Sequence, residues 1–298
     1  MKSSRLILTC ILLTFVAALP AMAGPRIFVS GLGNDANPGT REQPKRTFAS
    51  ALTVTDAGGE VVVLDPAGFG SSTLTIDKSV SIIVPAGIFG GIRVNSGNAI
   101  TVAAGPNDTV VLRGLTLNHG AGLNGIVFQS GRALHVENCI IDGFVGGHGI
   151  LVSPSAGESA RLFVKDTICR RNFNGVTYAA GRGSLDHVRL EQNSYGLYVS
   201  GSGTRVSTAN SVASGNSFGL WGSAGELNIE DCLVANNPGR GITSDSGATV
   251  RVSNSTVTNN GFGLYITSGS TLKSRGNNTV DGNNPANVNG TITSLSGM

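Results

Sequence analysis

The sequence predicts an all-β solenoid, a stack of coils that are each built from two or three short strands. Three observations support this fold class. Two columns of residues recur with one period, apolar and polar residues alternate inside each repeat, and helical patterns are almost absent. One coil of this kind cannot bury its own apolar side chains, so we expect the coils to stack around a continuous core.

The two repeating columns are an asparagine and a glycine that is followed by an apolar residue. Both recur at intervals of roughly 23 residues. The asparagine column contains Asn172, Asn193, Asn216, Asn237, Asn260 and Asn283, and the glycine column contains Gly125, Gly149, Gly175, Gly196, Gly219, Gly241 and Gly263. In stacked coils, equivalent strands pair in parallel about 4.8 Å apart. The asparagine side chains can then hydrogen-bond to one another along the stack as a ladder.

Each repeat also contains an alternating segment. Leu134 and Val136 are separated by one polar position, and Leu227 and Ile229 show the same pattern in a later repeat. A period of two is typical of a strand with one buried face.

The first residues have the features of a secretory signal peptide. Lys2 and Arg5 precede an apolar run, Leu6–Leu19, and Ala21-Met22-Ala23 fits a small-residue cleavage site. The apolar run is short for a membrane span. We therefore predict that residues 1–23 are removed, and that the mature chain is exported, periplasmic or extracellular, with no membrane span after cleavage.

The next segment differs from the repeats and predicts a cap. Residues 27–30 read as a short strand, and residues 47–57 place Phe48, Ala51 and Leu52 on one face of a short helix. A solenoid needs such a cover for the open end of its core. We predict an N-terminal strand, turn and helix cap over residues 24–60 and the solenoid over residues 61–298.

Charge and cysteine content exclude several classes of function. The formal net charge is only +3, whereas nucleic-acid binding usually requires a basic patch or stripe. Cys139 and Cys232 occupy one column four coils apart, about 19 Å at the spacing of stacked strands, which is too far for a disulfide. We expect Cys139, Cys169 and Cys232 to be buried thiols, and no residue spacing predicts a metal site or a cofactor.

Coil length, asparagine ladder and strand pattern together resemble the right-handed parallel β-helix proteins of the pectin-lyase-like superfamily, in their exported bacterial form. The resemblance extends from Val61 to about Asn289. It implies a right-handed parallel β-helix of roughly ten coils and suggests a link to carbohydrate, although a shared fold does not determine function.

Two short segments are similar to catalytic motifs within that superfamily. Gly147-His148-Gly149 is similar to the active-site signature of polygalacturonases, but the Asn-Thr-Asp, Asp-Asp and Arg-Ile-Lys segments of that family are absent. Leu185-Asp186-His187 is similar to a segment of pectate lyases, which also require an Arg-x-Pro-x-x-Arg segment that this chain lacks. The sequence therefore contains no complete catalytic motif.

The remaining catalytic candidates are His148, Arg170 and Arg171. They lie near the longest interval of the repeat, where Ser153–Ala160 predicts an extra loop, and loops on a rigid scaffold often carry function. The alternative is structural. The columns Glu137, Lys165, Asp186 and Asp142, Arg170, Glu191 alternate in sign, which predicts surface charge ladders; Arg170 and Arg171 could instead line a groove for a charged glycan.

Aromatic residues form the positive signal for binding. The second position after the repeat glycine holds Tyr198, Trp221 and Tyr265. The residue before each of them should point into the core, so these rings should point outward. Exposed aromatic side chains with a polar atom commonly mark binding surfaces, and we predict a carbohydrate-binding strip. Alternatively, the rings pack on each other or are covered by a partner subunit.

Three functions remain open at this point. The first is an exported β-helix protein that binds polysaccharide without an identifiable catalytic site. The second is a polysaccharide-active enzyme, either a lyase, a hydrolase or an epimerase. The third is a structural or adhesive surface module, which could be oligomeric.

Overall fold

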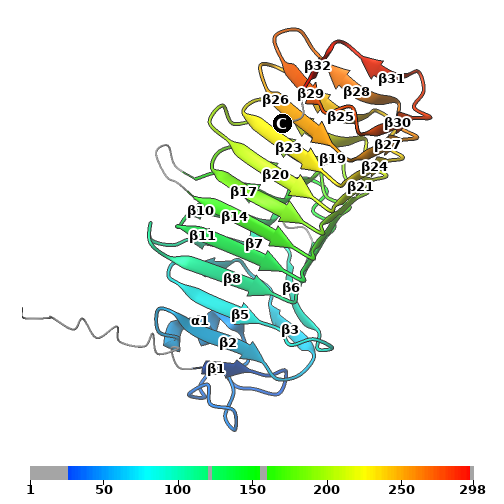
Figure 1. Cartoon of the computed structure of the whole chain (residues 1–298). Helices are drawn as coiled ribbons and strands as arrows, with labels where there is room; N and C mark the ends of the chain where they lie inside the picture. Colours follow the sequence, from blue (N-terminus) through cyan, green and yellow to red (C-terminus); the bar gives the residue numbers. More distant parts are fainter. Residues whose placement is uncertain (1–25, 120–122, 155–159, 296–298) are drawn as a thin grey trace, which may run out of the picture.

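The computed structural model describes residues 26–119, 123–154 and 160–295, and these form a right-handed parallel β-helix (Figure 1). Each coil contributes one strand to each of three parallel sheets, which we call sheets A, B and C. The expected fold class is therefore confirmed, with about ten coils and one short helix.

Sheet A has twelve strands, and sheets B and C have ten strands each in the described part of the chain. The strands of sheet A are β1 (Arg26–Val29), β2 (Gly59–Val63), β5 (Val80–Ile83), β8 (Thr109–Arg113), β11 (Ala133–Glu137), β14 (Arg161–Lys165), β17 (Arg182–Asp186), β20 (Arg205–Ala209), β23 (Glu226–Glu230), β26 (Thr249–Ser253), β29 (Thr271–Ser274) and β32 (Ile292–Ser294). Those of sheet B are β3 (Ala67–Gly70), β6 (Gly90–Val94), β9 (Leu115–His119), β12 (Ile140–Asp142), β15 (Ile168–Arg170), β18 (Arg189–Glu191), β21 (Val212–Ser214), β24 (Leu233–Ala235), β27 (Thr256–Thr258) and β30 (Thr279–Asp281). Those of sheet C are β4 (Leu74–Ile76), β7 (Asn98–Ala103), β10 (Asn124–Ser130), β13 (His148–Val152), β16 (Asn174–Tyr178), β19 (Tyr195–Val199), β22 (Phe218–Gly222), β25 (Arg240–Ser244), β28 (Phe262–Ile266) and β31 (Ala286–Asn289).

The core runs along the inside of the three sheets. The alternating residues of the repeats point inward, and Leu134, Val136 and Leu227 are fully buried. Cys139, Cys169 and Cys232 also lie in this core as free thiols. Burial raises the pKa of Cys139 to about 12, so this thiol stays protonated and behaves as a small apolar side chain.

The asparagine column forms a buried ladder at the corner between sheets B and C. The backbone N–H of Asn193 donates to Oδ1 of Asn216 (2.9 Å), and the N–H of Asn216 donates to Oδ1 of Asn237 (2.9 Å). The side-chain amide of Asn216 also donates to the carbonyl of Leu190 in the preceding coil (2.9 Å). The ladder therefore satisfies backbone groups that the corner removes from the sheets.

The glycine column is explained by a close approach between coils. A Cβ atom on Gly219 would lie 2.5 Å from the carbonyl oxygen of Gly241, and one on Gly196 would lie 2.6 Å from that of Gly219. Any side chain at these positions would collide with the backbone of the next coil. The repeat therefore requires glycine beside each asparagine of the ladder.

Two corners of the coil use left-handed backbone conformations: the corner between sheets A and B, and the ladder corner between sheets B and C. Asn138, Asp166, His187, Asn210, Asp231 and Asn254 have φ near 50° between sheets A and B, and Arg171, Gln192, Asn236 and Asn259 do so between sheets B and C. Asn and Asp tolerate this conformation better than most residues, which accounts for their frequency in the sequence. His187 thus occupies a turn position that other coils fill with Asn or Asp.

The N-terminal segment covers one end of the core (Figure 1). Helix α1 (Phe48–Val54) is capped by Thr47, whose side chain accepts from the N–H of Ser50, and it buries Phe48, Ala51 and Leu52. Strand β1 pairs with β2, so sheet A begins inside the segment that we expected to be a cap. The boundary at residue 60 stays a prediction, and the predicted signal peptide, residues 1–23, lies outside the described residues. No helix in the described ranges has the length and apolar character that a membrane crossing requires.

Candidate functional site

The outer surface of sheet C carries a group of aromatic side chains, which we call the aromatic strip. Strands β19 and β22 pair so that Tyr198 lies beside Trp221, and Thr243 of β25 separates Trp221 from Tyr265 of β28. The residue before each of these rings, such as Leu197 and Leu220, is buried. The three predicted rings therefore share one column and one face of the sheet.

A second column completes the aromatic strip. Tyr195 of β19 stacks on Phe218 of β22, with ring centroids 4.9 Å apart, and Phe218 contacts Trp221 edge-on at 5.0 Å. Tyr195 also lies 5.3 Å from Tyr198 and 5.4 Å from Trp221. The strip consists of Phe173, Tyr195, Tyr198, Phe218, Trp221, Phe262 and Tyr265. All but Phe173 are half-buried, because each ring covers part of its neighbours.

Arg240 is the cation of the strip. Its guanidinium carbon lies 3.6 Å from the ring centroid of Tyr265 and 5.0 Å from that of Trp221. Within the described residues no carboxylate pairs with this guanidinium. The strip therefore offers flat apolar faces together with N–H groups that can donate to a ligand.

Sequence reasoning missed Phe173, Tyr195, Phe218, Arg240 and Phe262 as members of the site. The last four precede the repeat glycine, a position that also holds Asn124 and His148. Strict alternation would place Tyr195 on the same face as the buried Leu197. The alternation breaks at Gly196, because Gly196 and Leu197 are both buried while Tyr195 stays half-exposed. The recurrence of aromatic residues at this position of the repeat was the sequence feature that could have identified them.

The predicted candidates Arg170 and Arg171 lie together on the opposite side of the asparagine ladder. Nε of Arg170 lies 3.2 Å from Asp142, and Nε of Arg171 donates to the same carboxylate at 2.8 Å. Burial alone would raise the pKa of Asp142, but the two guanidinium groups outweigh it and lower that pKa. The hollow beside them is lined by Arg93, Asn118, Asp142, Gly143, Val145 and Arg171.

His148 lies apart from that hollow, at the start of β13 in sheet C. Its Nδ1 atom is 2.9 Å from the hydroxyl of Thr177 and 3.2 Å from the amide of Asn174. Burial lowers the pKa of His148, which favours the neutral ring. The loop that we expected to make this coil distinct includes residues 155–159, which lie outside the described residues.

The expected charge ladders are present in the register of the strands. Glu137, Lys165 and Asp186 are successive partners in sheet A, and Arg113 forms an ion pair with Glu137 at 2.6 Å. The charge column Asp142, Arg170, Glu191 differs in detail from the expected ladder, because Glu191 pairs with Arg189 and not with Arg170. Among the described residues, no group of three or more His, Cys, Asp or Glu side chains has the geometry of a metal site.

The architecture and the ladder define a protein of the pectin-lyase-like β-helix type. The chain belongs to the family described as right handed beta helix region, which matches residues 90–284. A comparison with curated protein sequences finds no match.

Two solved structures show the same fold. The chain is similar to pectate lyase Pel9A, with 16% identity and a TM-score of 0.61 over 91% of this chain and 78% of that one. It is also similar to the GH136 lacto-N-biosidase from Eubacterium ramulus, with 11% identity and a TM-score of 0.52 over 90% of this chain and 67% of that one. At these identities the similarity shows the fold and leaves the activity open.

Proposed function

We propose that this protein is exported and binds polysaccharide through the aromatic strip. The observation that carries the proposal is the alignment of Tyr198, Trp221 and Tyr265 on one face of sheet C, with Arg240 between the last two. Flat rings in line along the stack suit the apolar faces of successive sugar units. The rigid sheet holds the rings in place before binding, so little conformational entropy is lost.

A binding role also explains why the residues of the aromatic strip remain half-exposed. Large aromatic side chains gain most from complete burial, yet this part of the surface places several of them together outside the core. Contiguous apolar patches on a protein surface commonly mark interaction sites. The structural relatives are named for action on glycans, which is consistent with a glycan as the partner here.

The proposal is tested by binding to a panel of insoluble and soluble polysaccharides, with Trp221→Ala, Tyr198→Ala and Tyr265→Ala as variants. An aromatic contact is worth about 1 kcal/mol, so each variant should lose affinity severalfold. Phe89→Ala is the matched control, because Phe89 is an exposed aromatic residue (48%) that precedes a strand of sheet B. Equal binding by wild type and all three variants would remove the strip as the site.

The same samples test the other two functions. If the wild type releases shortened or unsaturated sugar products, and His148→Ala or Arg170→Ala abolishes them, the protein is a polysaccharide-active enzyme and not a binding protein alone. A stable oligomer with no affinity for any glycan would favour a structural module.

Export is tested by sequencing the N-terminus of protein recovered outside the cytoplasm, where cleavage after Ala23 is expected.

A further inference from the structure

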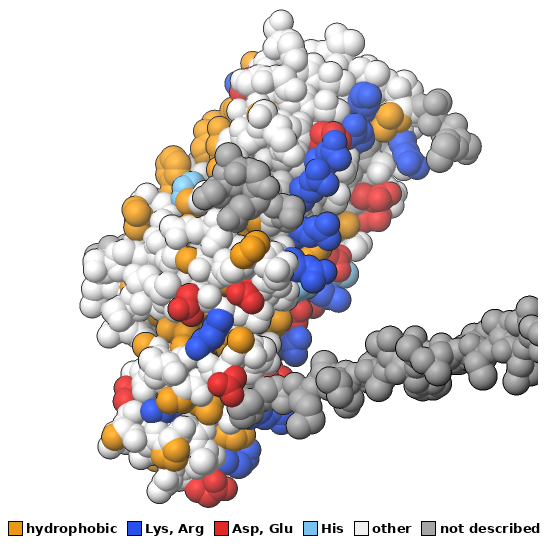
Figure 2. Space-filling model, turned by 90° about the vertical axis from the view of Figure 1, so that its left-hand side faces the viewer, with side chains coloured by type: hydrophobic (Ala, Val, Ile, Leu, Met, Phe, Trp, Pro, Cys, Tyr) orange, Lys and Arg blue, Asp and Glu red, His pale blue; other side chains and the backbone are white. Residues whose placement is uncertain are grey.

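Strand β31 is the outermost strand of sheet C in the described part of the chain and lies at the end of the β-helix opposite helix α1. Figure 2 shows that uncharged side chains cover much of this end, which is uppermost in the view, while Lys and Arg gather in a band to one side. The strand ends at Asn289, and Gly290 follows it; both residues are exposed. Asparagine is a thermolabile residue. Before glycine, its side-chain amide can be attacked by the next main-chain nitrogen, because glycine has no side chain that shields this atom.

Three other asparagines of the chain are also followed directly by glycine, namely Asn124, Asn174 and Asn260. The first two are buried in sheet C. The side-chain amide of Asn124 donates to Oδ1 of Asn98 at 2.8 Å, and that of Asn174 donates to the hydroxyl of Thr177 at 2.9 Å. Rotation of either amide toward the main chain would break a buried hydrogen bond, which costs free energy. These two pairs should therefore be inert in the folded protein.

The third pair belongs to the asparagine ladder. The amide of Asn260 donates to the carbonyl of Val234 at 3.0 Å, and its Oδ1 atom accepts from the N–H of Asn237 at 3.1 Å. The attacking nitrogen is also occupied, because the N–H of Gly261 donates to the carbonyl of Asn237 at 3.0 Å. The ladder thus holds both groups that would have to react.

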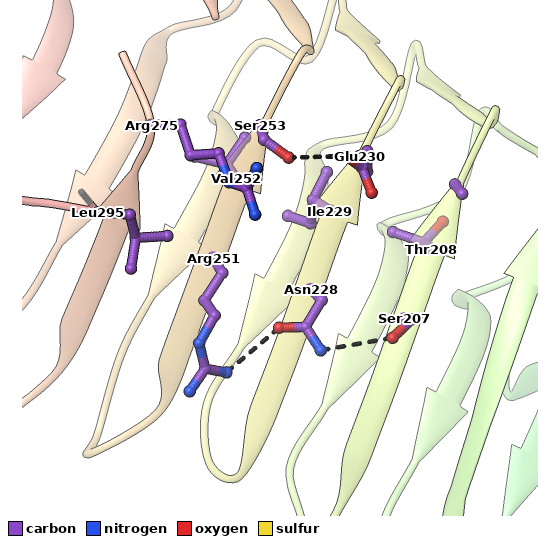
Figure 3. A pocket seen from close by; sticks show the side chains of 11 residues that line it. Ser207, Thr208, Asn228, Ile229, Glu230, Arg251, Val252, Ser253, Arg275 and Leu295 are labelled. Carbon is purple, nitrogen blue, oxygen red and sulfur yellow. Dashed lines mark hydrogen bonds between the residues drawn. The ribbon is translucent and has the colours of Figure 1, made fainter. Parts of the chain in front are cut away.

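Asn289 and Gly290 have none of these restraints. Among the described residues, no hydrogen bond is made by the Asn289 side chain or by the N–H of Gly290. A surface position alone does not give this freedom. Asn228 lies on the outer face of sheet A, yet its amide nitrogen donates to Ser207 at 3.4 Å and its Oδ1 atom accepts from Arg251 at 3.2 Å (Figure 3).

The backbone requires glycine at position 290. Gly290 has φ 100°, a conformation that other residues rarely adopt. A Cβ atom there would lie 2.8 Å from both the Cβ atom and the carbonyl oxygen of Ile266 in the preceding coil. The fold therefore excludes a larger residue that would shield the nitrogen, and the reactive pair is retained at this turn.

We propose that Asn289 is a site of self-modification, at which the chain converts its own amide to a carboxylate. The main-chain nitrogen of Gly290 loses its proton to solvent and attacks Cγ of Asn289. A new N–Cγ bond forms, the Cγ–Nδ2 bond breaks, and the amide leaves as ammonia, which takes up a proton. Water then opens the cyclic imide at either carbonyl and gives aspartate or isoaspartate. Overall, the reaction consumes water, releases ammonium and leaves a negative charge on residue 289.

The new carboxylate would lie beside the aromatic strip. Asn289 is the strand partner of Tyr265, and both residues face outward from sheet C. The guanidinium carbon of Arg240 lies 3.6 Å from the centroid of the Tyr265 ring, and this cation has no carboxylate partner within the described ranges. Opposite charges on neighbouring strands attract. We therefore expect the modification to draw the guanidinium toward residue 289 and away from Trp221.

The modification is tested by holding the purified full chain at mildly alkaline pH and following all four asparagines by peptide mapping with mass spectrometry and isoaspartate detection. In the folded chain Asn289 should react at least about tenfold faster than each of the other three, which would have to break buried hydrogen bonds. In guanidinium chloride the four rates should converge. Asn289→Gln is the matched control, because its longer side chain disfavours ring closure. Similar rates in the folded chain, or the same advantage of Asn289 after unfolding, would overturn the proposal.

The effect on Arg240 is tested separately by placing the charge directly. Asn289→Asp should shift the fluorescence of Trp221 to longer wavelength, and added salt should reduce the shift by screening. Asn289→Ser, which changes the side chain without adding charge, should leave the spectrum unaltered. In an Arg240→Ala background, Asn289→Asp should have no further effect. An unchanged spectrum in Asn289→Asp, or an equal shift in Asn289→Ser, would refute the coupling. Neither measurement uses a polysaccharide, so its result is independent of the proposed function.

Discussion

Arg240 lies over the ring of Tyr265, with its guanidinium carbon 3.6 Å from the ring centroid, while the ring of Trp221 flanks it on the other side at 5.0 Å. The aromatic strip is therefore held together by a cation between two rings that are two strands apart. Such a contact contributes about 0.5–1 kcal/mol at an exposed site.

This relationship predicts a spectroscopic change. Trp221 is the single tryptophan of the chain, so its fluorescence reports on the strip alone. Arg240→Ala should expose the indole ring to water and shift its emission to longer wavelength. Arg189→Ala, on sheet B, should leave the spectrum unchanged. An unaltered spectrum in Arg240→Ala would show that the guanidinium does not cover the ring in solution.

The close approach of coils predicts that the repeat glycines cannot be replaced. In Gly219→Ala the new Cβ would lie 2.5 Å from the carbonyl oxygen of Gly241 and 2.8 Å from Val234. Overpacking of this kind costs about 1–3 kcal/mol or more, which thermal or urea unfolding measures. Gly203→Ala is the matched control, because a Cβ atom added at Gly203 would meet no other atom within 4 Å. Similar stabilities of the two variants would contradict the packing argument.

The asparagine ladder predicts a large effect from a single amide. Asn216→Ala removes the acceptor of the Asn193 N–H and the donor to the Leu190 carbonyl. A buried polar group without a partner costs about 1–3 kcal/mol, so the free energy of unfolding should fall by about 2–4 kcal/mol. Asn95→Ala, at an exposed position, should change it little. A loss no greater than that of the control would mean that water or a shifted backbone replaces the ladder.

Burial of His148 predicts a stability that depends on pH. Because the pKa of His148 is lowered in the folded chain, folding favours the neutral ring. Its contribution is complete above the unfolded pKa of about 6.5 and is lost as the pH falls below that value. His148→Asn, which restores the residue found at Asn124 and Asn174, should reduce the loss of stability between neutral and mildly acidic pH. The free energy of unfolding is measured in urea at several pH values. If it changes with pH in the same way in the wild type and in His148→Asn, burial of His148 does not cause the pH dependence.

Much of the architecture follows from the repeat alone. The spacing of the asparagine and glycine columns predicts which residues become neighbours, and Glu137, Lys165 and Asp186 are strand partners as the columns require. The outward direction of Tyr198 and Trp221 follows from the same alternation. Periodicity succeeds here because each coil contacts mainly its two neighbours, so the register is a local property.

The candidate site was predictable only in part. Tyr195 and Phe218 join the strip because the alternation breaks at the repeat glycine, which is buried together with the residue that follows it. The column Asp142, Arg170, Glu191 predicts that Arg170 faces Asp142, but it does not predict that Arg171 reaches the same carboxylate. Arg171 has a left-handed backbone conformation (φ 54°) at the corner before the ladder. A column of repeat positions in the sequence does not predict backbone conformation at such a corner.

By itself, the sequence determined the solenoid, its period, the buried ladder and the aromatic column, because these depend on recurrence at one spacing. Only the tertiary structure decided how the corners direct their side chains. It placed Arg240 between two rings, brought Arg171 onto the carboxylate that Arg170 also contacts, and separated His148 from Arg171. The physical reason is that contacts across a corner or along the stack depend on backbone direction in three dimensions, whereas a repeat records only distance along the chain.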